Sequence, residues 1–119
     1  MEGQKDVIVV SQQAGAHVVE FVVERLLDEV DIARISEQLD LLIKQMDSPL
    51  LVLDFANVKY MSSSALGMLI TLYKRICERN GRMALCTVRA EIYEVFTITK
   101  LSEVFQIYES RTTAMAGLA

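Results

Sequence analysis

The sequence predicts a single α/β domain with a mixed, mostly parallel sheet, and three observations support this prediction. Short runs rich in valine, leucine and isoleucine alternate with longer segments whose apolar residues recur every three or four positions. The chain has 119 residues, of which 52% are hydrophobic. It contains one proline. This length suits one domain over residues 1–119 with a buried core, and the composition does not fit a disordered chain.

The elements are expected in the order β-β-α-β-α-β-α-β-α. Runs of β-branched or wholly apolar residues mark the strands, while apolar spacings of three and four mark the helices. We expect strands at residues 7–10, 18–23, 50–53, 82–87 and 104–108. We expect helices at residues 32–46, 62–80 and 91–99, and a short last helix after Ser110 or Thr112. Strands that alternate with helices imply right-handed crossovers and parallel pairing, whereas the opening hairpin adds an antiparallel pair.

Local signals set the limits of several elements. The polar segment 11–15 ends in a glycine and predicts the opening hairpin. Asp28 and the acidic residues after it crowd the first turn of the first helix, where the helix dipole favours negative charge. Pro49 is expected to end that helix, and Gly81 is the expected stop of the second.

Charge and cysteine content exclude several classes of function. Twelve Lys and Arg against sixteen Asp and Glu give a net charge of −4 with no basic run, so nucleic acid is not an expected partner. Cys77 and Cys86 are too far apart for a CxxC pair, which indicates buried, reduced thiols in a cytoplasmic protein. No apolar run is long enough to insert into a membrane, and nothing resembles an export signal.

Patterns typical of catalysis and of cofactor or metal binding are missing. The five glycines form neither a dinucleotide-binding motif nor a Walker loop. His17 is the only histidine and starts a predicted strand without an evident partner, so we interpret it as a surface or edge residue. One histidine and two separated cysteines do not make a zinc site. We therefore expect no cofactor, no metal and no enzymatic activity.

Three serines follow the central apolar strand, at the expected start of the second long helix. Residues 53–67 read LDFANVKYMSSSALG: the strand ends in Asp54, and after a short loop come Ser62, Ser63 and Ser64. A serine oxygen at this place can cap the helix by accepting hydrogen bonds from its free N–H groups. A hydroxyl there is also exposed, and a phosphate on it would face the positive end of the helix dipole. Capping and phosphorylation are equally compatible with this pattern.

The same stretch resembles the signature of STAS domains, the fold shared by anti-sigma-factor antagonists and the cytoplasmic tails of sulphate transporters. Leu27-Asp28 and the passage 95–108 resemble the corresponding parts of that family, so the likeness covers essentially the whole chain. The resemblance implies a STAS fold and, in the antagonist branch, phosphorylation of one serine by an anti-sigma factor that is also a serine kinase. In that branch the unphosphorylated antagonist binds the kinase and frees a sigma factor, and a PP2C-type phosphatase resets the cycle.

The resemblance also assigns roles to single residues. Alignment on Leu66 and the glycine after it places the phosphoacceptor at Ser63, with Ser62 and Ser64 as alternatives. Ser62 stands where the family usually has an acidic residue, and Ala65 stands where it usually has glycine.

Partner contacts are expected around the serines. The helix after them is apolar nearly all round, which is typical of a buried helix or of one that presents a binding patch. Met68 is the expected exposed contact, since methionine suits adaptable interfaces. The expected partner-binding residues are Asp28, Asp54, Ser62, Ser64, Leu66 and Met68. Asp28 could equally be a helix cap, and Asp54 could simply end its strand.

Phosphorylation-controlled binding of an anti-sigma kinase is the first hypothesis for function. The alternative is a STAS-type accessory subunit of a membrane transporter, docked without phosphorylation, or a scaffold of a larger signalling complex. A small nucleotide-binding or phosphoryl-transfer protein would need a phosphate-binding loop, which the sequence lacks. No pattern in the sequence points to an oligomeric state.

Overall fold

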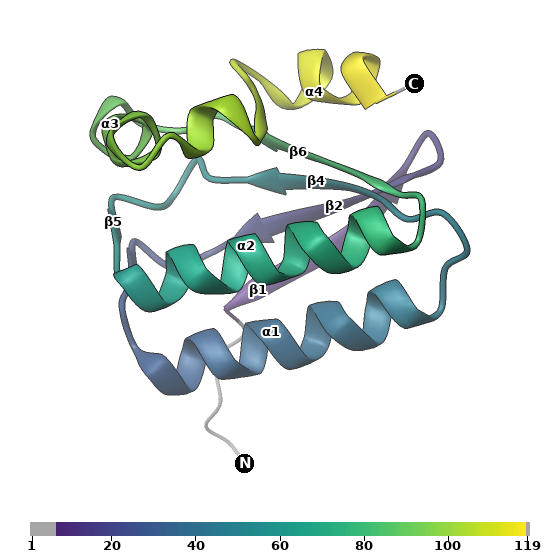
Figure 1. Ribbon diagram of the computed structural model, residues 1–119, viewed down its shortest axis with the longest axis horizontal. Coiled ribbons are helices and arrows are strands. Elements are labelled where there is room, and N and C mark those ends of the chain that lie inside the picture. The colour runs from purple at the N-terminus through teal and green to yellow at the C-terminus, as the bar shows by residue number, and fades with distance from the viewer. Residues whose placement is uncertain (1–6, 119) are drawn as a thin grey trace.

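The computed structural model describes residues 7–118, which form a mixed five-stranded sheet with helices on both faces (Figure 1). The strands are β1 (Ile8–Gln13), β2 (Ala16–Phe21), β3 (Arg25–Leu26), β4 (Leu50–Asp54), β5 (Tyr60–Met61), β6 (Arg82–Cys86) and β7 (Gln106–Tyr108). The helices are α1 (Glu29–Lys44), α2 (Ser63–Glu78), α3 (Ala90–Ile98), the short 3-10 helix η1 (Leu101–Glu103) and α4 (Arg111–Leu118). The predicted fold class and the predicted order of the main elements are confirmed.

The sheet has the strand order β1-β2-β4-β6-β7. β1 pairs with β2 antiparallel, and the other neighbours pair in parallel. The parallel strands therefore all end at the same edge of the sheet, where the helices that follow them begin. β3 and β5, which were not predicted from the sequence, pair in parallel as a separate two-stranded sheet.

The opening hairpin turns later than expected. β1 continues through Gln13, and the turn consists of Ala14 and Gly15 alone, with φ angles of 49° and 85°. Two residues with positive φ form the type I′ turn, whose twist matches that of a two-stranded ribbon. The prediction stopped at Val10 because the residues after it are polar, but an edge strand facing water accepts polar side chains.

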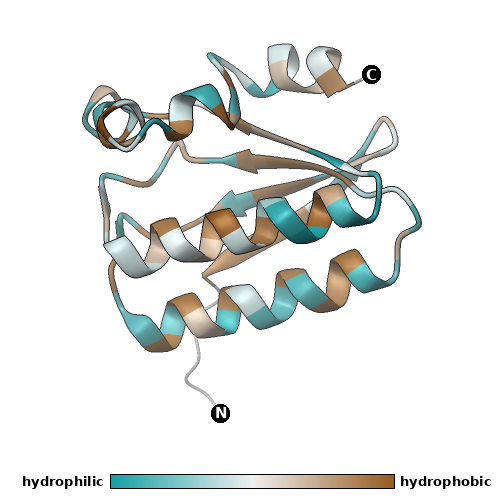
Figure 2. Ribbon diagram, viewed as in Figure 1, coloured by the Kyte–Doolittle hydropathy of each residue, from teal (hydrophilic) through white to brown (hydrophobic). Residues whose placement is uncertain are grey.

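The two faces of the sheet contribute to separate apolar clusters. The larger cluster lies between the sheet and α1, α2 and α3, and it includes the ring of Phe55, which contacts Phe21 in a tilted arrangement and Phe96 edge to face. The smaller cluster lies under α4, which covers the opposite face (Figure 1). Hydrophobic residues dominate the central strands, as expected for strands buried on both sides (Figure 2).

Two helix ends differ in detail from the predicted stops. α1 ends at Lys44, before Pro49, and the guanidinium of Arg79 donates to the carbonyl oxygens of Lys44 at 3.2 Å and Met46 at 2.8 Å. These bonds satisfy carbonyl groups at the helix end that would otherwise lack a partner.

At the end of α2 the left-handed residue is Asn80, with a φ of 58°, and not Gly81. Gly81 is needed for another reason, since a Cβ atom there would lie 2.2 Å from the carbonyl oxygen of Pro49. At the last helix, Ser110 provides the cap: its Oγ accepts a hydrogen bond of 3.1 Å from the amide of Thr113. Among residues 7–118 there is no helix with the length and apolar character needed to cross a bilayer.

Candidate functional site

The starts of α1 and α2 lie next to each other at the edge of the sheet where the parallel strands end (Figure 1). The small β3–β5 sheet joins the loops that lead into these helices, pairing Arg25 with Tyr60 and Leu26 with Met61. Beyond this pairing, the amide of Ser62 donates a hydrogen bond of 3.1 Å to the carbonyl oxygen of Leu26. The Asp28 loop and the serine turn therefore form one surface.

Asp28 and Ser62 are the N-caps of the two helices. One carboxylate oxygen of Asp28 accepts hydrogen bonds from the amides of Val30, at 2.8 Å, and Asp31, at 3.1 Å. The Oγ of Ser62 accepts one of 3.2 Å from the amide of Ala65. The capping interpretation of these residues is thus confirmed, and Asp28 is also exposed at the surface.

Ser63 and Ser64 are the first two residues of α2, and both side chains are exposed. Since Ser62 already caps the helix, the hydroxyls of Ser63 and Ser64 are not needed for that purpose. Ser64 lies on the side of α2 that faces α1, where it lines a groove together with Glu29. Three serines that look alike in the sequence therefore have three different environments.

The groove between the first halves of α1 and α2 has a volume of about 280 Å³. It is lined by Glu29, Ile32, Ala33, Ser36, Ser64, Gly67, Met68 and Thr71. Met68 is one of these lining residues, but only 7% of its surface is exposed, so the prediction of an exposed methionine is wrong. The reason is that α1 packs alongside α2 and covers this position. Leu66 is half-buried and packs against the main cluster, which leaves it part of its surface for a partner.

Asp54 is buried and forms an ion pair inside the fold. Only 6% of its surface is exposed. One carboxylate oxygen accepts hydrogen bonds from Arg111 at 2.7 and 3.1 Å, and the other accepts one of 2.9 Å from the amide of Ala56. A carboxylate in this position is closed off from a partner, so the expectation of direct contact through Asp54 is corrected. Its place at the end of β4 agrees with the alternative that it ends its strand.

Arg111, the first residue of α4, joins this helix to two strands of the sheet. Besides Asp54, its guanidinium approaches the carboxylate of Glu20 on β2 at 3.6 Å. The hydrogen bond to Asp54 is the main reason why the pKa of Arg111 is raised. Asn57 adds to the cluster by donating hydrogen bonds to Glu20 at 3.3 Å and to the carbonyl oxygen of Phe21 at 3.1 Å. This cluster holds α4 in place.

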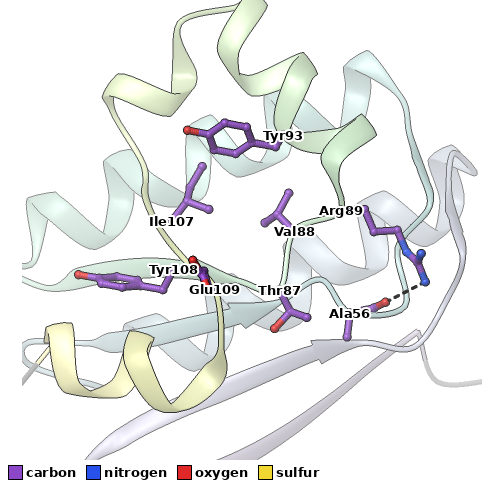
Figure 3. Close-up of a pocket in the computed structure, with 8 residues that line it drawn as sticks. All are labelled: Ala56, Thr87, Val88, Arg89, Tyr93, Ile107, Tyr108 and Glu109. Atoms are coloured by element: carbon purple, nitrogen blue, oxygen red, sulfur yellow. Dashed lines mark hydrogen bonds between the residues drawn. The ribbon is translucent and has the colours of Figure 1, made fainter.

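A larger cavity, of about 690 Å³, opens where β6 and β7 end and α3 begins (Figure 3). It is lined by Ala56, Thr87, Val88, Arg89, Tyr93, Ile107, Tyr108 and Glu109. The guanidinium of Arg89 donates a weak hydrogen bond of 3.4 Å to the carbonyl oxygen of Ala56. No sequence pattern predicted this cavity, because its walls come from three separate segments with no shared motif.

The two cysteines and the histidine lie on three different elements, α2, β6 and β2. Cys86 is buried, as expected, and burial raises the pKa of its thiol. Cys77 is exposed on α2, so the prediction that both thiols are buried is wrong. His17 is half-buried on β2, and its Nε2 lies 2.9 Å from the amide nitrogen of the Gln12 side chain. In the described part of the chain, no three His, Cys, Asp or Glu side chains are grouped so that they could hold a metal ion.

Comparison with known sequences agrees with the resemblance noted above. Residues 7–114 match the model of the STAS domain. Over 81 residues the chain is 30% identical to the anti-sigma F factor antagonist of Paenibacillus polymyxa, and the alignment covers 68% of this chain and 69% of that protein.

Solved structures show the same architecture. An anti-sigma-factor antagonist (STAS) domain protein from Planctomyces limnophilus superposes with a TM-score of 0.86 at 27% identity, covering 93% of this chain and 97% of that one. Phosphorylated SpoIIAA from Bacillus gives a TM-score of 0.75 at 15% identity, covering 94% and 99% of the two chains. The murine anion transporter Slc26a9 gives 0.75 at 15% identity, with 91% of this chain matched to 18% of the transporter. The last two likenesses concern the fold alone.

Proposed function

This chain belongs to the STAS-domain family, and we propose that it acts as an anti-sigma-factor antagonist switched by phosphorylation at Ser63. In its unphosphorylated form it binds an anti-sigma factor that is also an ATP-dependent serine kinase, and thereby frees a sigma factor. Phosphorylation by that kinase ends the binding, and a PP2C-type phosphatase restores it. The protein is then a kinase substrate and binding partner in the cytoplasm, and it performs no catalysis itself.

The observation that carries this proposal is the position of Ser63. It is exposed at the first turn of α2, beside a serine that has already taken the capping role. Its hydroxyl is thus open to a kinase without loss of a structural hydrogen bond. Ser64 is exposed as well, but it lines the groove that also contains Glu29, and a phosphate directed into this groove would meet a negative charge. The structure therefore favours Ser63 over Ser64, in agreement with the alignment.

The helix start accommodates a phosphate on Ser63 without unfolding. The positive end of the α2 dipole and its free N–H groups favour an anion at this place. At the start of α1 on the same surface, Asp28 and Glu29 are both acidic, while the basic residues of the adjoining β3–β5 segment already have partners: Arg25 lies over the ring of Tyr60, and Lys59 pairs with Glu24 at 3.6 Å. Phosphorylation thus turns a mildly acidic surface into a strongly acidic one.

The size of this effect is sufficient for a switch. A phosphate adds about −1.5 to −2 charges. At about 4 Å from one like charge near a protein surface, each unit of charge costs roughly 4 kcal/mol. A loss of about 2.8 kcal/mol already weakens binding about a hundredfold. A partner with an acidic group facing Ser63 is therefore released without a change of conformation in this domain.

Both departures from the family pattern are compatible with this role. Ala65 is fully buried, so its methyl group points into the core and does not stand between Ser63 and a partner. Ser62, in place of an acidic residue, supplies the oxygen that caps α2. The STAS fold also tolerates the modification, since SpoIIAA has been solved in its phosphorylated and unphosphorylated forms.

A STAS-type accessory subunit of a membrane transporter is the second candidate. It is favoured by the likeness of the fold to part of Slc26a9. In this role the serine turn would be a helix cap and docking surface, and Ser63 would remain unmodified.

Affinity capture from the native host distinguishes the anti-sigma-factor antagonist from the transporter subunit. Ser63→Ala and Ser63→Asp serve as baits, with Ser48→Ala and Ser48→Asp as matched controls at an exposed serine between α1 and β4, away from the starts of both helices. We expect a serine kinase of the ATPase type on Ser63→Ala and on both Ser48 variants, and its loss on Ser63→Asp. Equal recovery of the kinase on Ser63→Asp, or recovery of a permease in its place, would contradict the proposal.

A further inference from the structure

The five-stranded sheet has one long edge that is free in the described chain. At one side, β7 has three residues, and at the other, β1 has six. Proteins normally protect an edge strand by keeping it short, by placing charged residues or proline on it, or by covering it. β7 is short, but β1 reads IVVSQQ and carries neither a charge nor a proline. Its register with β2 is also continuous, without a bulge.

The pairing of β1 with β2 shows which main-chain groups are free. The amide of Val22 donates to the carbonyl oxygen of Val7 at 3.0 Å, so these two residues form a hydrogen-bonded pair. Hydrogen-bonded and non-hydrogen-bonded pairs alternate along an antiparallel ladder, so every second residue from Val7 onward bonds to β2. The residues whose N–H and C=O groups point to the open edge are therefore Ile8, Val10 and Gln12.

Apolar side chains are exposed at the same place. Val9 and Val10, in the first half of β1, expose 49% and 41% of their surface. Because neighbours on a strand point to opposite faces, each face of the sheet presents one of these valines at its edge. On the neighbouring strand β2 the carboxylate belongs to Glu20, and the guanidinium of Arg111 already lies 3.6 Å from it. A strand added beside β1 would cover apolar surface and meet little charge.

We propose that this added strand is β1 of a second copy of the chain, paired antiparallel about a two-fold axis at Val10. In this register Val10 of one copy faces Val10 of the other, and Ile8 of each faces Gln12 of the other. All three are hydrogen-bonded pairs, and each exchanges two main-chain bonds. The Val10 side chains meet on the face of α1 and α2, to which Val19, the β2 partner of Val10, also belongs. On the opposite face Val9 meets Ser11.

The register favours a second copy over an unrelated extended peptide. The free main-chain groups form a symmetric set around Val10, so the strand is complementary to itself, as a two-fold interface requires. A peptide would be selected by charged or shaped sites along the edge, and β1 offers no charge for this. The net charge of −4 per chain opposes association only weakly, since salt screens charges beyond about 8 Å at physiological ionic strength.

Sedimentation equilibrium over a dilution series tests the dimer. For the wild type we expect twice the 13.4 kDa of one chain at the concentrated end of the series. Val10→Pro removes an N–H that the internal ladder does not use, so it blocks the added strand while β1–β2 pairing is kept. Val10→Lys places two like charges opposite each other on the axis. Val10→Thr keeps the N–H and the β-branched shape and is the matched control.

The proposal predicts dimers for the wild type and Val10→Thr, and monomers for Val10→Pro and Val10→Lys. If Val10→Pro does not fold, the oligomeric state of Val10→Lys and hydrogen exchange of the backbone amides in the wild type test the proposed dimer instead. Exchange of the Val10 amide slows as the protein is concentrated, whereas that of Val9, which bonds to β2 in the monomer, does not change. A wild type that stays monomeric throughout, a dimer that survives Val10→Lys, or a Val10 amide indifferent to concentration would overturn it.

Discussion

The amide of Ser62 donates a hydrogen bond of 3.1 Å to the carbonyl oxygen of Leu26, and this bond ties the serine turn to the loop before α1. Leu26 is fully buried, so the bond fixes the turn to the core. Ser62 also caps α2 with its side chain. The main chain and side chain of one residue thereby set the position of the neighbouring Ser63, the proposed phosphoacceptor.

Removal of the cap oxygen is expected to weaken α2 without affecting the exposed hydroxyls. Ser62→Ala leaves an N–H at the start of α2 unpaired and should lower the free energy of unfolding by about 1 kcal/mol. Ser62→Asp keeps a cap acceptor and should stay near the wild type. Urea unfolding measures both. A Ser64→Ala variant, which removes no cap, should change stability by less than about 0.5 kcal/mol, and an equal loss there would contradict the assignment of Ser62 as the cap.

Two glycines offer a paired test of packing around α2. A Cβ at Gly81 would collide with the carbonyl oxygen of Pro49, so Gly81→Ala should destabilise by about 1–3 kcal/mol or more. Gly67 lies inside α2 with open space around it, so Gly67→Ala should stabilise by about 0.5–1 kcal/mol through helix propensity. Thermal unfolding gives both values, and a Gly81→Ala variant as stable as the wild type would show that the close approach to Pro49 is wrong.

Loss of the Arg111 side chain should cost stability because it leaves the buried Asp54 carboxylate without its charged partner. We expect Arg111→Met to lower the free energy of unfolding by about 2–3 kcal/mol, as for other buried groups that lose a hydrogen bond to a charge. Arg34→Met, which removes an exposed arginine 4.0 Å from Asp31, should cost less than about 0.5 kcal/mol. Chemical denaturation compares the two. Similar losses would argue that the Arg111 pair is no stronger than a surface contact.

Asp40 links α1 to α2 and should make the fold sensitive to acid. Partial burial opposes its ionisation, but Lys44 at 3.3 Å and Arg75 at 2.7 Å outweigh this effect, so the pKa of Asp40 lies below its ordinary value of 3.8. A carboxyl with a lowered pKa in the folded state stabilises the protein above pH 3.8, and this contribution is lost as the pH falls through the folded-state pKa.

The free energy of unfolding of Asp40→Asn and of the wild type, measured over a range of pH, tests this prediction. The variant should be less stable than the wild type at neutral pH by up to about 1 kcal/mol, and the difference should vanish in acid. A difference that stays constant with pH would exclude an electrostatic origin.

The fold could be predicted because its strongest patterns are local. The apolar stripe of α1 and the doubly apolar strand β4 are visible in sequence, and their alternation implies parallel crossovers. The caps Asp28 and Ser62 were also predictable, because capping depends only on a few adjacent residues. By contrast, β3 and β5 have two residues each, which is too short for any periodicity.

The candidate site could be predicted from the sequence only where its geometry depends on residues adjacent in the chain. Met68 is buried because α1 packs beside it, and no spacing within α2 reveals that contact. The bond between Asp54 and Arg111 joins residues 57 positions apart, so the sequence gives no reason to link them. The different environments of Ser63 and Ser64 likewise depend on which side of α2 faces α1.

Titration of the anti-sigma kinase with this protein in three forms tests the proposed switch: unmodified, phosphorylated at Ser63, and Ser63→Ala. Isothermal titration calorimetry in the presence of a non-hydrolysable ATP analogue measures each affinity. We predict equal affinity for the unmodified protein and Ser63→Ala, and a loss of about a hundredfold or more for the phosphorylated form. Equal binding of the phosphorylated and unmodified proteins would contradict the switch.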